Sequence, residues 1–71
     1  MKYAIVIEKG ENNFSAYVPD LPGCVSTGST IEEVKKNMQD AIEFHIQGLK
    51  QDGDEIPLPV SISDTVEVAA Y

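Results

Sequence analysis

The sequence of 71 residues lacks arginine and tryptophan, and its twelve acidic residues outnumber its five lysines, giving a formal net charge of −7. Proteins that bind nucleic acids rely on Lys and Arg side chains to neutralise phosphates. A domain with this charge should repel DNA and RNA, so we predict no nucleic-acid contact through it. Complementary charge favours a basic protein partner, although acidity also serves solubility alone.

Long apolar runs and paired cysteines are absent as well. No stretch of about 18 apolar residues occurs that could span a membrane, so no membrane contact is expected. Cys24 has no partner for an internal disulfide, and with no secretory signal it predicts a reducing, cytoplasmic location. The chain is expected to form one domain, residues 1–71, which buries only about 60% of its unfolded surface. We therefore expect a homo-oligomer, a dimer or a tetramer, that buries more apolar surface.

Alternation of apolar and polar residues predicts four strands. They are expected over residues 2–8, 14–18 and 24–27, and within residues 61–69. The first is apolar at every central position, which is typical of a central strand. In the last, Val66 and Val68 are the apolar positions.

One helix is expected after the third strand. Thr30 is a good N-cap, and Glu33 three residues later completes a capping box. Apolar residues and one histidine then recur at steps of three and four, at Ile31, Val34, Met38, Ala41, Ile42, His45, Ile46 and Leu49. This spacing predicts one buried stripe. Gly53 marks the end of the helix, and two prolines beyond it prevent continuation.

A rigid corner links the second and third strands. Pro19 removes a backbone donor and so ends the second strand. Pro22 and Gly23 suit the two central positions of a type II turn, because proline presets φ and glycine accepts a positive φ. The predicted order is therefore β-β-β-α-β, an α+β fold in which one helix covers one face of the sheet. Tyr3 and Tyr17 are expected on the uncovered face, and Phe44 lies off the helical stripe; all three are candidate oligomer contacts.

No residue pattern predicts catalysis, a metal site or a cofactor. The carboxylates available for nuclease chemistry, such as Glu8 and Asp20, accompany no basic surface for a substrate, so we interpret them as surface groups. His45 has no second ligand at metal spacing and is interpreted as a structural or oligomer contact, with a chemical role as the alternative. Cys24 follows a tight turn and is interpreted as a buried residue rather than a nucleophile. We expect no enzyme.

The run Pro-Asp-Leu-Pro-Gly-Cys at residues 19–24, the capped helix start at residues 28–33 and the Ile-Pro-Leu-Pro run at residues 56–59 are similar to the HicB-like antitoxin family of type II toxin–antitoxin systems. The resemblance covers the chain from Tyr3 to about Val68. It implies a truncated ribonuclease H-like fold and a protein that neutralises a small basic HicA-type toxin by covering its RNA-binding or active face. HicB antitoxins commonly carry a further DNA-binding segment, and none is expected here because the sequence ends after the last strand.

Acidic side chains are the expected contacts for such a toxin. They occur at strand ends and turns and in the stretch after the helix: Glu8, Glu11, Asp20, Asp52, Asp54 and Glu55. The alternative function is an orphan HicB-like oligomer that serves as an interaction module without a toxin.

Overall fold

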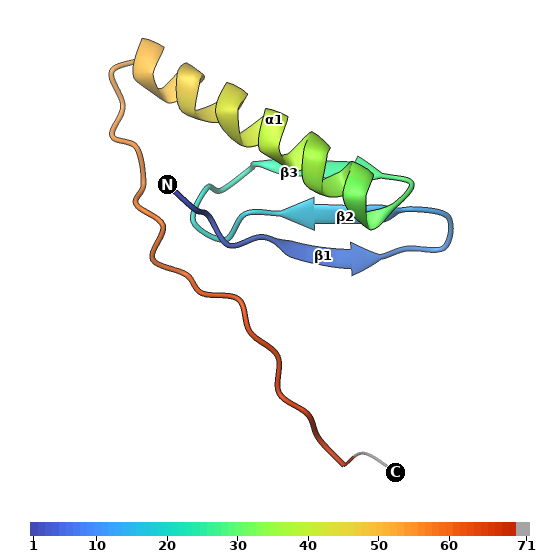
Figure 1. The fold of residues 1–71 in the computed structure, drawn as a ribbon. Coiled ribbons are helices and arrows are strands. Elements are labelled where there is room, and N and C mark those ends of the chain that lie inside the picture. Colours follow the sequence, from blue (N-terminus) through green and yellow to red (C-terminus); the bar gives the residue numbers. More distant parts are fainter. Residues whose placement is uncertain (70–71) are drawn as a thin grey trace.

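The computed structural model describes residues 1–69. Its elements are the strands β1 (Val6–Lys9), β2 (Phe14–Tyr17) and β3 (Val25–Gly28), followed by the helix α1 (Ile31–Gln51). The strands form one antiparallel sheet in the order β1-β2-β3. As Figure 1 shows, α1 crosses one face of this sheet, where it contacts mainly β3 and β2. The α+β class and the single covering helix are confirmed.

The corner after β2 is a pair of turns. The Leu21 N–H donates to the Val18 carbonyl and the Cys24 N–H donates to the Leu21 carbonyl, each at 3.1 Å. Pro22 and Gly23 occupy the middle of the second turn, and Gly23 has φ of 82°. This is the positive φ that a type II turn requires, so the predicted turn is confirmed. The corner points Leu21 inward, where it is fully buried.

Thr30 caps the start of α1 and Gly53 follows its end, as predicted, but the Glu33 carboxylate reaches Ser29 rather than the Thr30 N–H expected in a capping box. The Thr30 hydroxyl accepts a hydrogen bond from the Glu33 N–H at 3.0 Å, and the Glu33 carboxylate accepts one from the Ser29 N–H at 2.8 Å. At the other end, the Asp54 N–H donates to the Leu49 carbonyl across Gly53, at 2.9 Å. These bonds satisfy backbone groups that a helix leaves without internal partners.

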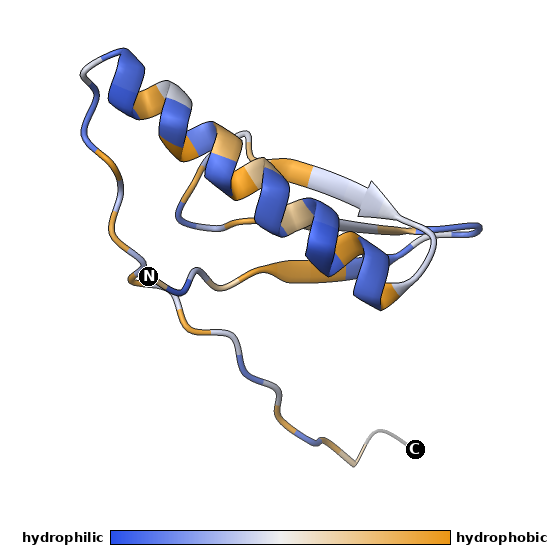
Figure 2. Cartoon of the chain, turned by 45° about the horizontal axis from the view of Figure 1, so that its top comes forward, coloured by the Kyte–Doolittle hydropathy of each residue, from blue (hydrophilic) through white to orange (hydrophobic). Residues whose placement is uncertain are grey.

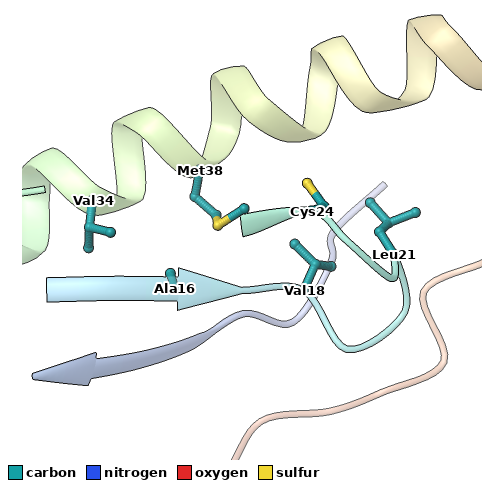
Figure 3. Packing of buried hydrophobic residues seen from close by; sticks show 6 residues of the cluster. All are labelled: Ala16, Val18, Leu21, Cys24, Val34 and Met38. Atoms are coloured by element: carbon teal, nitrogen blue, oxygen red, sulfur yellow. The ribbon is translucent and has the colours of Figure 1, made fainter. Parts of the chain in front are cut away.

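The core lies between α1 and the sheet. Figure 3 shows its six buried side chains: Ala16, Val18, Leu21, Cys24, Val34 and Met38. Gly28 lets α1 approach β3 closely, because a Cβ atom at this position would lie 2.6 Å from the Val34 nitrogen. The corner and the first half of the helix therefore supply most of the buried surface.

Residues 54–69, which we call the arm, leave the end of α1 and return past the start of β1 (Figure 1). The arm is extended, and none of it pairs as a strand in the described residues. The expected last strand within residues 61–69 is thus wrong for this chain on its own, and β1 lies at the edge of the sheet rather than at its centre. The physical reason is that alternation selects an extended conformation but does not supply the neighbour whose backbone would pair with it.

Candidate protein-interaction surface

The Asp20 carboxylate fastens the arm to the corner. It accepts hydrogen bonds from the Val60 N–H at 3.0 Å, from the Ser61 N–H at 2.9 Å and from the Ser61 hydroxyl at 2.8 Å. These bonds, above all that from the Ser61 backbone, lower the pKa of Asp20 because they favour its charged form. Sequence analysis placed Asp20 among the partner contacts, whereas here both of its oxygens are engaged by the arm.

Two further bonds hold the arm beside the first residues of the chain. The Tyr3 hydroxyl donates to the Pro57 carbonyl at 2.5 Å, and the Ser63 hydroxyl donates to the Ile5 carbonyl at 3.3 Å. Tyr3 packs against the core cluster and lies with Met38 and other α1 residues around one surface hollow. It therefore lies on the helix side of the sheet, and its expected position on the uncovered face is wrong.

The arm presents apolar side chains to solvent on both sides of these anchors. Those at even positions from Leu58 onward are strongly exposed, with Ile62 at 92% and Val66 at 87%. Figure 2 shows hydrophobic and hydrophilic residues alternating along the arm. An extended segment with one apolar face is built to lie against another surface, and the surface of its own domain does not cover it.

The sheet face opposite α1 carries an apolar row. Val6 pairs with Tyr17 across β1 and β2, and Tyr17 pairs with Val25 across β2 and β3, so the three side chains lie side by side. Tyr17 is 42% exposed and Val25 is 65% exposed. Tyr17 was a predicted oligomer contact, and the structure places it at the centre of this row. Val25 was missed, although its position directly after the buried Cys24 implies the opposite face.

The remaining predicted contacts lie in separate places. Glu8 and Glu11 are exposed at the hairpin between β1 and β2, while Asp52, Asp54 and Glu55 are exposed after the end of α1. Figure 1 shows that these two groups lie at opposite ends of the molecule. The chain therefore has two acidic ends rather than one acidic patch.

Phe44, the third predicted oligomer contact, is exposed on α1. It lies beside a surface hollow between the second half of the helix and the corner, to which His45 and Gly48 also contribute. His45 is half-buried there. This position agrees with a packing role for His45.

The described residues contain no group of three or more His, Cys, Asp or Glu side chains that could hold a metal ion. Cys24 is buried, as predicted, and burial raises the pKa of its thiol, which keeps it protonated at neutral pH. Within residues 1–69, no helix combines the length and apolar character needed to cross a bilayer.

Three comparisons relate the chain to known proteins. The model of the HicB-like antitoxins of bacterial toxin–antitoxin systems matches residues 3–71. A chain in the solved structure of a HicA3 and HicB3 toxin–antitoxin complex is similar, with a TM-score of 0.74 and 35% identity over 84% of this chain and 70% of that one. This likeness agrees with the α+β fold described above.

Curated relatives are similar at the sequence level. An uncharacterised 14.9 kDa protein of Haemophilus phage HP1 is 39% identical over all 71 residues, which span 53% of that protein. A UPF0150 protein of Helicobacter pylori is 49% identical over 47 residues, 66% of this chain and 65% of the relative. The chain thus spans between about half and two thirds of these two relatives. A UPF0150 protein of Archaeoglobus fulgidus is 38% identical over 84% of this chain and 91% of its own length.

Proposed function

Because this chain belongs to the HicB-like antitoxin family of bacterial toxin–antitoxin systems, we propose that it neutralises a small basic HicA-type toxin by binding it and covering its RNA-binding or active face. The observation that carries the proposal is the similarity to a chain of a HicA3 and HicB3 complex. The net charge of −7 supports it, since an acidic surface attracts a cationic one and speeds encounter. The proposed role is binding rather than catalysis.

The two acidic ends are the proposed toxin contacts. Glu8 and Glu11 at the hairpin are free of hydrogen bonds from other residues in the described part of the chain, as are the side chains of Asp52, Asp54 and Glu55. Asp20 is left out of this proposal because it holds the arm. The same acidity argues against nucleic-acid binding through this domain.

Co-expression tests the proposal. Any small basic protein encoded beside this gene is expressed with the chain, and growth is scored together with co-purification of the two proteins. We expect rescue of growth and a stable complex that weakens as salt is raised. Failure of the chain to bind and to restore growth against a toxic HicA-type neighbour would overturn the proposal.

Charge reversal then locates the contact. One variant carries Glu8→Lys and Glu11→Lys, and the other carries Asp52→Lys, Asp54→Lys and Glu55→Lys. We expect the variant that disrupts the true contact to lose rescue while the other keeps it. Equal rescue by both variants would exclude these acids as the binding surface.

The exposed apolar surfaces favour a second role, which is self-association. The row Val6–Tyr17–Val25 and the exposed arm are the surfaces that such an oligomer would cover. An antitoxin that binds a toxin could also self-associate in this way. Alternatively, the chain is an orphan interaction module that self-associates without a toxin. Light scattering of the purified chain separates a monomer from a dimer or tetramer. The reducing cytoplasm stays our predicted location because of the single cysteine.

A further inference from the structure

One edge of the sheet is open for pairing. β1 has a neighbour on one side only, whereas the outer side of β3 is partly closed by Asn37 of α1, which donates to the Thr27 carbonyl at 2.8 Å. The Ile5 carbonyl points outward, since it accepts from Ser63 of the arm. Backbone groups of one residue point to the same side of a strand and repeat with a period of two. Ile7 and Lys9 therefore also direct their N–H and C=O groups outward.

The outer arm, residues 64–69, is a strand without a neighbour. It is extended, every residue in it is exposed, and Val66 and Val68 lie on one of its faces. Beyond Ser63 it leads away from the body of its own domain (Figure 1). Its apolar face can therefore be buried only on something outside this body.

We infer that the outer arm of one copy pairs as an antiparallel strand with the open edge of β1 in a second copy. This inference rests on the self-association proposed above and not on toxin binding. The pairs are Asp64 with Lys9 and Val66 with Ile7, on the part of β1 beyond the contact between Ile5 and Ser63. The side chain of Ile7 already packs against the core, so the partner's Val66 extends that core outward.

Charge fixes the register. In the proposed pairing, Asp64 lies opposite Lys9, the basic residue of the exposed edge strand. Shifting the arm by one residue toward the start of β1 places Asp64 opposite Glu8, and shifting it by two residues toward the hairpin places Asp64 opposite Glu11. Both shifts create a like-charge pair, which destabilises a sheet. The remaining neighbouring register sets Val66 against Glu8. Only the proposed alignment joins apolar with apolar and acid with base.

The pairing must come from another copy. Ser63 is fastened beside Ile5 of its own chain, and Lys9 lies about 13 Å further along the strand at 3.3 Å per residue. Asp64, the next residue, does not reach it, and the arm would have to reverse its direction. A second copy related by a two-fold axis solves both problems, because each arm then covers the open edge of the other.

Sedimentation of the purified chain and its variants tests the inference. We expect the natural chain to be a dimer, and Val66→Asp, Asp64→Lys and Lys9→Asp each to raise the dissociation constant roughly tenfold or more, since each change occurs at two equivalent sites. The double variant Lys9→Asp with Asp64→Lys restores the dimer. Thr65→Asn, an uncharged change on the opposite face of the arm, is the matched control and leaves the dimer intact. A monomeric natural chain, or a double variant that stays monomeric, would overturn the inference.

Cross-linking gives a second, independent readout. Lys9→Cys chains are mixed with Asp64→Cys chains and oxidised, so that a disulfide between the two can form only between copies. We expect a covalent dimer from this mixture and far less from Glu8→Cys chains mixed with Asp64→Cys chains. Equal cross-linking in both mixtures contradicts the register. These measurements use this chain alone, so their failure would leave toxin neutralisation standing.

Discussion

The carboxylate of Asp20 receives both the backbone N–H and the hydroxyl of Ser61, a residue 41 positions later in the chain. The corner that begins the third strand thus also fixes the last part of the molecule. Asp20 accepts three hydrogen bonds from the arm, whereas Tyr3 and Ile5 each make one, so within the described residues Asp20 is the main anchor of the arm. Its removal is the most direct test of the architecture.

Asp20→Ala should release the arm while leaving the sheet and helix folded, because the arm contributes no residue to the buried core. We expect faster hydrogen exchange at the Val60 and Ser61 amides and unchanged exchange in α1. Glu55→Ala is the matched control, since Glu55 is an exposed acidic residue of the same arm that lies outside the contact with Asp20. Unchanged protection of the two amides in Asp20→Ala would contradict the anchor.

Acid should detach the arm in the same way. The pKa of Asp20 is lowered in the folded chain from its ordinary value of 3.8, so the unfolded state binds the proton more readily. The stabilising contribution is therefore fully present above that ordinary value and is lost as the pH falls through the lower folded pKa. Carboxyl chemical shifts and amide exchange, followed between pH 6 and the acid limit of folding, measure this loss. Asp20→Asn should remove the acid-dependent step, and a step that persists would point to another carboxylate.

Replacing Gly28 and Gly48 by alanine should change the free energy of unfolding in opposite directions. At Gly28 the added Cβ would lie 2.6 Å from the Val34 nitrogen, so Gly28→Ala forces α1 away from β3 and should cost about 1–3 kcal/mol. At Gly48, within α1, the added Cβ meets nothing within 4 Å, and Gly48→Ala should raise stability by about 0.5–1 kcal/mol. Denaturant unfolding measures both. A neutral Gly28→Ala variant would show that the close helix–strand approach is not required.

The start of α1 should depend on its cap. Thr30→Ala removes the acceptor of the Glu33 N–H and should lower the free energy of unfolding by about 1 kcal/mol. Thr30→Ser keeps the hydroxyl and serves as the control, with little change expected. Loss of stability in both variants would mean that the threonine methyl group, rather than the cap, matters.

Local features were predictable from the sequence because local residues determine them. The start and end of the helix follow from Thr30 and Gly53, and the turn follows from Pro22 and Gly23. Burial of Cys24 follows from its place after that turn. In each case, the signal and the structure it forms lie within a few positions of one another.

Features that join distant segments were not predictable in this way. Nothing near Asp20 shows that its acceptor oxygens serve residues forty positions away, so it resembled a free surface acid. The apolar centre of the first strand suggested a central position, yet β1 lies at the edge and packs only one side against the core. The alternation of apolar and polar residues after Val60 was visible in the sequence, but such alternation does not indicate which strand the segment pairs with.

All six core residues lie between Ala16 and Met38, and the arm adds none. During synthesis the N-terminal part of a chain is made first and begins to fold first. The segment that carries all six core residues is therefore made before the arm, and the arm is not needed to complete that core. Substitutions in the arm should therefore alter what the domain assembles with, while the domain still folds around the core formed by its first half.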